Sequence, residues 1–318
     1  MEQSIRSLPT IRDRQRALLA WYARHGRHAL PWRLTRDPYG ILVSEVMLQQ
    51  TQVDRVIPYW TTWLRRWPTV ETLARARRAS VIRAWAGLGY NRRAVYLHQL
   101  AQEIVRHGWP TECSWMMHGA RRNTWETPKS TIVEIGVFPE ERHIMRYAQA
   151  LQQLPGIGPY TANALLAFAW NLPVPCVDTN VRRVLAYVIL RRPSLMRMSL
   201  PRVMALAAPV IPRGKGRIWH YALMDYGALV LTARHPNVQS RALDKRRRVQ
   251  PERFAGSSRF WRGRIVAVLR ELRGALPLAV LRKRLMAFGD PPDDLERLVN
   301  ALVRDGVIRA SLRGYRLA

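Results

Sequence analysis

Apolar side chains recur at helical spacing along most of this chain. In residues 10–25 they fall at Ile11, Leu18, Leu19 and Tyr22, which lie on one face of an amphipathic helix. The pattern therefore predicts a mainly α-helical fold. The same spacing predicts helices over residues 41–65, 79–86, 91–106, 144–153, 160–170, 178–190, 199–211 and 217–232, with a further helix start at Thr69.

Two segments lack this periodicity. Residues 109–143 read as an insertion in which TIVEIGVF is a candidate strand, and loops of this length are usually functional or disordered. Residues 233–257 are polar and basic and contain KRRR, which is typical of a linker or of a loop that lies on phosphate groups.

The last segment has its own pattern. Residues 258–318 predict three helices, in FWRGRIVAVLREL, PLAVLRKRL and DDLERLVNALVRDG, followed by alternating apolar residues around Gly314 that suit a hairpin. Three helices and a terminal hairpin are the outline of a winged helix. We therefore expect one domain over residues 1–257 and a small winged-helix-like domain over residues 258–318.

Charge narrows the choice of partner. The chain of 318 residues carries 52 Lys and Arg against 22 Asp and Glu, a formal net charge of +30. Such an excess favours a polyanion, either nucleic acid or an anionic membrane surface, although arginine-rich codon usage explains part of it. The charged N-terminus lacks a signal-peptide core, and the most apolar run is broken by Asn171, Pro173 and Pro175. We therefore expect a nucleic-acid partner and no membrane.

Cysteine usage limits the chemistry further. The two cysteines, Cys113 and Cys176, can form neither a disulfide framework nor a four-cysteine metal site. A reducing cytoplasm is the expected compartment, and Cys176 reads as a small core residue.

The most informative local motif is LPGIGPYTA at residues 154–162. Gly156 and Gly158 allow positive φ and a close approach of the backbone to a ligand. A helix is expected to begin at Pro159 or Tyr160, so the turn directs backbone N–H groups and a helix N-terminus at an anion such as phosphate. With helices on both sides, the motif predicts a helix-hairpin-helix.

Over residues 20–231 the chain resembles the helix-hairpin-helix (HhH-GPD) DNA glycosylases, most closely the MutY-type adenine glycosylases. The resemblance implies two helical lobes, about residues 38–165 and residues 1–37 with 166–257, and duplex DNA in the cleft between them with one nucleotide extruded from the stack. The matching strings are LPWR at 30–33, SEVMLQQTQV at 44–53, WAGLGY at 85–90, LPGIGPYTA at 154–162, VDTNVRRVLA at 177–186 and ALMDYGALV at 222–230.

The resemblance also implies catalytic roles. Glu45 would be the general acid that protonates the departing base and then positions water, and Asp178 would stabilise the oxocarbenium-like sugar. Asn180 would support Asp178, which also suits a helix N-cap. Tyr160 stands where bifunctional relatives carry a Schiff-base lysine, so we expect a monofunctional enzyme without efficient strand cleavage.

Other positions are implied as binding residues. Gln50 and Tyr90 match residues that MutY enzymes insert into the base stack, although a tyrosine after a glycine turn also suits a core aromatic. Thr161, Gly156 and Gly158 of the hairpin would contact DNA, and a monovalent cation is compatible with this turn. Trp32 matches a residue that lines the adenine pocket, and it equally suits a packing tryptophan.

The chain departs from the family in its cofactor. Most relatives hold an iron–sulfur cluster with C-x6-C-x2-C-x5-C, and that pattern falls here on Leu231, Val238, Arg241 and Arg247. We therefore expect no cluster and no other cofactor.

Two further departures concern specificity. Tyr221 stands where MutY enzymes place a Glu or Gln that reads adenine, and residues 258–318 are too short for the Nudix-like domain that many of them carry. The leading hypothesis is an adenine glycosylase acting on adenine opposite guanine or 8-oxoguanine, as a monomer on duplex DNA in the cytoplasm and nucleoid. The alternatives are a glycosylase for thymine or uracil opposite guanine or for another damaged base, and a non-catalytic DNA-binding protein.

Overall fold

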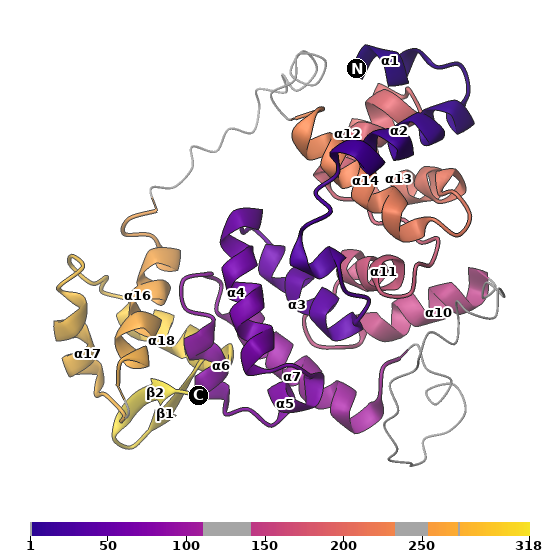
Figure 1. Ribbon diagram of the computed structural model, residues 1–318. Coiled ribbons are helices and arrows are strands. Elements are labelled where there is room, and N and C mark those ends of the chain that lie inside the picture. The colour runs from indigo at the N-terminus through magenta and orange to yellow at the C-terminus, as the bar shows by residue number, and fades with distance from the viewer. Residues whose placement is uncertain (1, 111–140, 233–253, 273) are drawn as a thin grey trace. The chain divides into compact units, whose positions relative to one another are not determined.

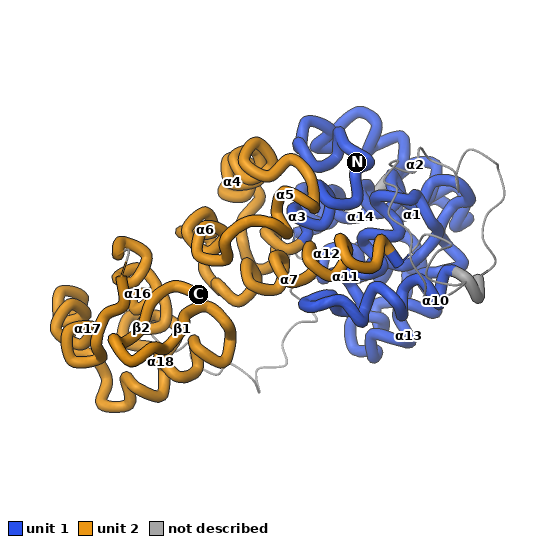
Figure 2. The backbone as a smooth tube through the Cα atoms, turned by 90° about the horizontal axis from the view of Figure 1, so that it is seen from below, with its two compact units in different colours: residues 1–45, 110–244 blue, residues 46–109, 245–318 orange. Residues whose placement is uncertain are grey.

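The computed structural model describes residues 2–110, 141–232, 254–272 and 274–318 (Figure 1). The chain divides into two compact units, residues 1–45 with 110–244 and residues 46–109 with 245–318 (Figure 2). The candidate strand TIVEIGVF and the KRRR run lie outside the described residues.

The units do not follow the predicted domain boundaries. Helix α3 is divided between them, because the N-terminal segment of the first unit ends at Glu45 and the second unit begins at Val46. The segment that was expected to be a separate domain over residues 258–318 belongs to the same compact unit as residues 46–109.

All regular secondary structure in the described part of the first unit is helical. The hydroxyl of Thr10 caps α2 by accepting from the Asp13 backbone N at 3.1 Å. Its elements are α1 (Glu2–Ser7), α2 (Ile11–His25), the 3-10 turn η1 (Pro31–Arg33), α3 (Pro38–Leu48), α10 (Glu141–Gln152), α11 (Pro159–Phe168), α12 (Thr179–Val184), the π-helical turn η2 (Leu185–Ile189), η3 (Pro193–Arg197), α13 (Leu200–Ala207), η4 (Ala208–Val210) and α14 (Gly216–Leu229).

Helix α14 is the centre of packing in this unit. Trp21 of α2 meets Tyr226 of α14 edge to face, with ring centroids 4.9 Å apart. On another side, Gly227 lies against α12 so closely that a Cβ atom there would come within 2.7 Å of the Asn180 Cβ. The glycine therefore lets α12 and α14 pack backbone to backbone, which places the start of α12 against a rigid neighbour.

The second unit combines helices from two parts of the sequence. Thr69 caps α5 as expected, because it accepts from the Thr72 backbone N and its own N–H donates to the Thr72 hydroxyl. The elements are α4 (Val53–Arg66), α5 (Val70–Ala74), α6 (Arg78–Ala84), α7 (Arg92–His107), α16 (Ser258–Arg270), α17 (Leu278–Leu285), α18 (Leu295–Arg304), β1 (Ile308–Ser311) and β2 (Gly314–Leu317).

The prediction of a single helix over residues 41–65 is wrong. The chain leaves helical conformation after Leu48, Gln50 has a left-handed φ of 57°, and α4 begins at Val53. The Arg93 guanidinium replaces the missing helical donors, because it donates to the carbonyls of Val46 (2.8 Å), Met47 (3.1 Å) and Gln49 (2.6 Å). Apolar periodicity does not reveal a break that a distant arginine stabilises.

The C-terminal segment has the predicted winged-helix outline. Strands β1 and β2 pair antiparallel with Ile308 opposite Leu317. Leu276, between α16 and α17, exchanges two backbone hydrogen bonds with Tyr315 at 2.8 and 2.9 Å and so extends the hairpin.

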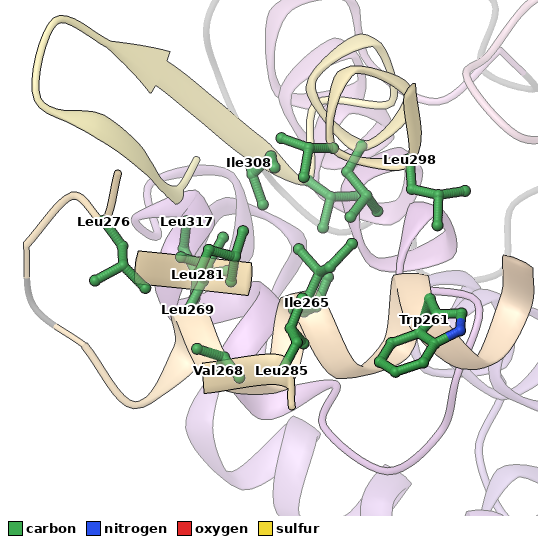
Figure 3. Packing of buried hydrophobic residues seen from close by; sticks show 14 of the residues in the cluster. Trp261, Ile265, Val268, Leu269, Leu276, Leu281, Leu285, Leu298, Ile308 and Leu317 are labelled. Atoms are coloured by element: carbon green, nitrogen blue, oxygen red, sulfur yellow. The ribbon is translucent and has the colours of Figure 1, made fainter. Parts of the chain in front are cut away.

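This segment shares one hydrophobic core with α6 and α7 (Figure 3). Ile82 and Val95 are buried in the same cluster as Trp261, Ile265 and the other apolar residues of α16, α17, α18 and the hairpin. The winged-helix-like segment and residues 46–109 are therefore packed as one body.

Candidate active site

Glu45 is carried by an apolar helix whose first turn is capped. Asp37 accepts hydrogen bonds from the backbone N–H groups of Tyr39 (3.1 Å) and Gly40 (2.9 Å) at the start of α3. Ser44 and Val46 on either side of Glu45 are buried, whereas Glu45 itself keeps partial exposure. The helix thus places one carboxyl at the edge of an apolar core.

The environment of Glu45 favours its protonated form. Burial raises the pKa of the Glu45 carboxyl from 4.5 to about 7, and the neighbouring Asp178 charge adds to this rise. The Arg33 charge and a hydrogen bond with the Tyr160 hydroxyl act in the opposite direction and lower the pKa. A carboxyl that titrates near neutral pH is suited to general acid catalysis.

Asp178 caps a helix and also lies next to the Glu45 carboxyl. Its Oδ1 accepts from the Val181 backbone N at 2.7 Å, which makes it the N-cap of α12, and its Oδ2 accepts from the Asn180 side chain at 3.2 Å. Burial raises its pKa, and the hydrogen bonds from Val181 and Asn180 oppose this shift. Asn180 therefore contacts Asp178 directly.

Arg33, whose charge acts on Glu45, is itself held in place by Asp225 and Tyr221. It makes a two-pronged ion pair with the buried Asp225, at 2.6 Å (Nη1 to Oδ2) and 2.9 Å (Nη2 to Oδ1). Its guanidinium lies 4.5 Å from the ring centroid of Tyr221, and Tyr221 stacks on Phe168 at 4.7 Å. Burial and the Glu45 charge raise the pKa of Tyr221, so its phenol stays neutral.

The sequence did not single out Arg33 or Asp225 as site residues. Both lie inside the matching strings LPWR and ALMDYGALV, and this was the signal that could have found them. Trp32, the neighbour of Arg33, is buried in η1 as either of its two interpretations requires. Cys176 is a fully buried free cysteine, in agreement with the prediction of a core residue.

The hairpin LPGIGPYTA forms the start of α11. Gly156 has a φ of 79°, as predicted, whereas Gly158 has an extended φ of −93° and serves as the N-cap of α11. Space for a Cβ at Gly158 is open, since no atom lies within 4 Å. Tyr160 and Thr161 follow in the first turn, where Thr161 is buried and Tyr160 reaches Glu45.

Gln50 and Tyr90 lie together in the second unit. Both have left-handed backbones, with φ of 57° and 48°. Arg93 links their two loops, because one nitrogen donates to the Gln49 carbonyl and the other to Leu88 (2.9 Å) and Gly89 (3.2 Å). Sequence reasoning did not single out Arg93, although it holds together the two loops that carry these candidate residues.

Comparison with known proteins agrees with this arrangement. Residues 43–197 match the HhH-GPD superfamily of base excision DNA repair proteins. The adenine DNA glycosylase of Mycobacterium tuberculosis is 36% identical over 314 residues, covering 93% of this chain and 90% of the relative. The chain belongs to the adenine DNA glycosylase family. A second member, from Mycolicibacterium smegmatis, is 34% identical over 93% of both chains.

Solved structures show the fold of this glycosylase family. A thermostable thymine-DNA glycosylase matches with a TM-score of 0.54 and 24% identity, over 71% of this chain and 89% of the other. This likeness confirms the mainly helical HhH-GPD fold. The activity as a DNA glycosylase is confirmed by the adenine DNA glycosylase relatives and by the match to the base excision repair family.

The residues of this family member do not fit an iron–sulfur cluster. Leu231, at the first ligand position, is fully buried, and its carbonyl accepts from Arg183 Nε at 3.1 Å. Val238, Arg241 and Arg247 lie outside the described residues, and none of the four is a cysteine. Within the described ranges, no three His, Cys, Asp or Glu side chains gather to hold a metal ion.

No helix among the described residues is both long enough and apolar enough to span a membrane.

Proposed function

We propose that this DNA glycosylase is a monofunctional adenine glycosylase, which hydrolyses the bond between deoxyribose and an adenine mispaired with guanine or 8-oxoguanine in duplex DNA. It would act as a monomer in the cytoplasm and nucleoid, without a cofactor. The observation that carries the proposal is the Glu45 carboxyl with a pKa of about 7, hydrogen-bonded to Tyr160 and close to Asp178.

The carboxyls of Glu45 and Asp178 have different roles in the proposed reaction. Protonated Glu45 donates its proton to the departing base, which leaves with the electron pair of the glycosidic bond. Asp178, held by Val181 and Asn180, provides negative charge for the cationic sugar that remains. Glu45, now a carboxylate, accepts a proton from the water that attacks the sugar. The products are free base and an abasic site.

Tyr160 supports the monofunctional reaction. Its phenol hydrogen-bonds to Glu45 and cannot form a Schiff base with the sugar. Strand cleavage would need an amine at this position. The Tyr160 phenol found there instead holds the carboxyl of the general acid Glu45.

Adenine is favoured by the names of the relatives at 34–36% identity over most of the chain. Thymine or uracil opposite guanine remains the second candidate, because the neutral phenol of Tyr221 replaces the carboxylate or amide expected of an adenine-reading residue. A phenol presents one donor and one acceptor, so it constrains the base less than an amide does.

Single-turnover assays on duplexes containing A:8-oxoguanine, A:G, T:G and U:G test the proposal. We expect base release from the two adenine duplexes, strand breaks only after alkali, and a loss of about a hundredfold or more in Glu45→Gln. Glu103→Gln, which removes a partly exposed carboxylate of α7 that pairs with Arg106, is the control for the same chemical change. If only thymine or uracil is released, the second candidate function replaces the first. If the wild type binds the duplexes tightly but releases no base, the proposed enzymatic activity is refuted.

A further inference from the structure

Tyr90 combines an exposed position with a left-handed backbone. Its side chain is 42% exposed and its φ is 48°, a region that costs a non-glycine residue of order 1 kcal/mol. Arg93 fixes the preceding backbone through Leu88 and Gly89, and its guanidinium lies 5.6 Å from the Tyr90 ring. The loop therefore presents an aromatic ring to solvent in one fixed place.

The C-terminal segment reaches this ring. Arg259, an exposed residue in the first turn of α16, donates from Nη1 to the Tyr90 hydroxyl at 2.8 Å. Its guanidinium carbon lies 5.7 Å from the Tyr90 ring and 4.9 Å from the ring of Phe254, which is itself 55% exposed. One arginine of the C-terminal segment thus connects two exposed aromatic rings.

The attachment of α16 makes this contact a fixed one. Asp305, after α18, pairs with both Arg262 of α16 and Arg92 of α7, the latter at 3.4 Å. Trp261, two residues after Arg259, is buried in the core that includes Val95 of α7. Arg259 therefore stands beside Tyr90 because the two helices are packed and paired, not because a long side chain happens to reach it.

We propose that Arg259 is a positioning residue for Tyr90, through which the C-terminal winged-helix-like segment takes part in recognising the mispair. Arg259 holds the Tyr90 ring in the orientation that meets the bases of duplex DNA. Its remaining N–H groups and positive charge suit an adjacent phosphate. The inference rests on the proposed function, because it assigns Tyr90 to the DNA-contacting surface of the glycosylase.

A double-mutant cycle on the full chain tests this role. Arg259→Ala, Tyr90→Phe and the double variant are compared for single-turnover rate and for dissociation constant, on a mispaired duplex and on a fully paired one. We expect each single variant to lower the preference for the mispaired duplex about three- to tenfold, because each breaks the same contact. The double variant should then lose no more than the worse single variant.

Two further variants separate positioning from charge. Arg259→Lys should recover part of the preference, since an ammonium group can still donate to the Tyr90 hydroxyl. Arg264→Ala removes an equal charge from the same helix, but Arg264 stacks on Phe260 and Phe288 instead of Tyr90. It should weaken binding to both duplexes alike and leave the preference unchanged.

The outcomes distinguish this inference from the proposed function. Additive losses in the cycle, or equal behaviour of Arg259→Ala and Arg264→Ala, would overturn the role of Arg259 even in an active enzyme. If the wild type cleaves no duplex, the proposed function fails, and the dissociation constants still decide the inference: a non-additive loss of mispair preference supports it and an additive one refutes it.

Discussion

Glu45→Gln is expected to make the protein more stable while it removes activity. The pKa of the Glu45 carboxyl rises from 4.5 to about 7 on folding. Below pH 4.5 the carboxyl is neutral in both the folded and the unfolded chain. As the pH rises toward 7, the unfolded chain loses this proton first, so the folded state loses stability across that window. Glutamine is neutral throughout and is free of this cost.

The magnitude follows from the two pKa values. The interval between 4.5 and about 7 corresponds to about 3 kcal/mol at pH 8. Because Glu45 is partly exposed to water, we expect the measured gain to be between about 1 and 3 kcal/mol. Close to pH 4.5 the variant and the wild type should differ by less than about 0.5 kcal/mol.

Urea unfolding without DNA at pH 4.5 and pH 8 measures this difference. Glu103→Gln, which makes the same carboxylate-to-amide change on α7 at a partly exposed position, is the control for the chemical change itself. Parallel pH profiles for Glu45→Gln and the wild type would refute the argument, because they would show that Glu45 does not titrate abnormally in the folded protein. In the active wild type, the same titration should lower the rate of base release above about pH 7.

Three further substitutions are expected to have distinct effects. Tyr160→Phe removes a hydrogen bond that lowers the pKa of Glu45, so the fall in glycosylase rate should move to higher pH; an unshifted profile would contradict this. Gly227→Ala would place a Cβ within 2.8 Å of the Asn180 carbonyl oxygen, so it should lower stability by about 1–3 kcal/mol and also lower activity. Gly263→Ala, at an open position, is the control and should be neutral or slightly stabilising in thermal unfolding. In Arg93→Lys, a single ammonium group cannot replace the guanidinium that donates to both loops. This variant should lose about 2 kcal/mol or more of stability and bind mispaired duplex more weakly. Unchanged affinity would show that Arg93 has no part in recognition.

The sequence predicted the elements that depend on local signals. The helical periodicity of residues 10–25, the cap at Thr69 and the hairpin after Gly314 all correspond to observed elements. Asp178 was expected to be both a helix N-cap and a site residue, and the structure brings the cap together with Asn180 near Glu45. Each of these follows from residues close together in the chain.

Features that depend on distant partners could not be predicted. The break after Leu48 exists because Arg93, far along the chain, satisfies the carbonyls at the end of α3. The ion pair of Arg33 with Asp225 joins residues 192 positions apart, and no periodicity encodes it. In the same way, the pattern that predicts a helix near residue 258 does not predict the hydrogen bond between Arg259 and the Tyr90 hydroxyl.

The shared core of α6, α7 and the C-terminal segment also limits how this protein can be altered. Ile82 and Val95 would be left facing water if the chain ended before α16, although the sequence places a domain boundary there. A truncated enzyme would thus carry an exposed apolar surface on α6 and α7, and precipitation of such a variant would say nothing about mispair recognition. Any replacement for this terminal segment would have to cover the apolar faces of α6 and α7 again, so the segment and its supporting helices have to be changed together.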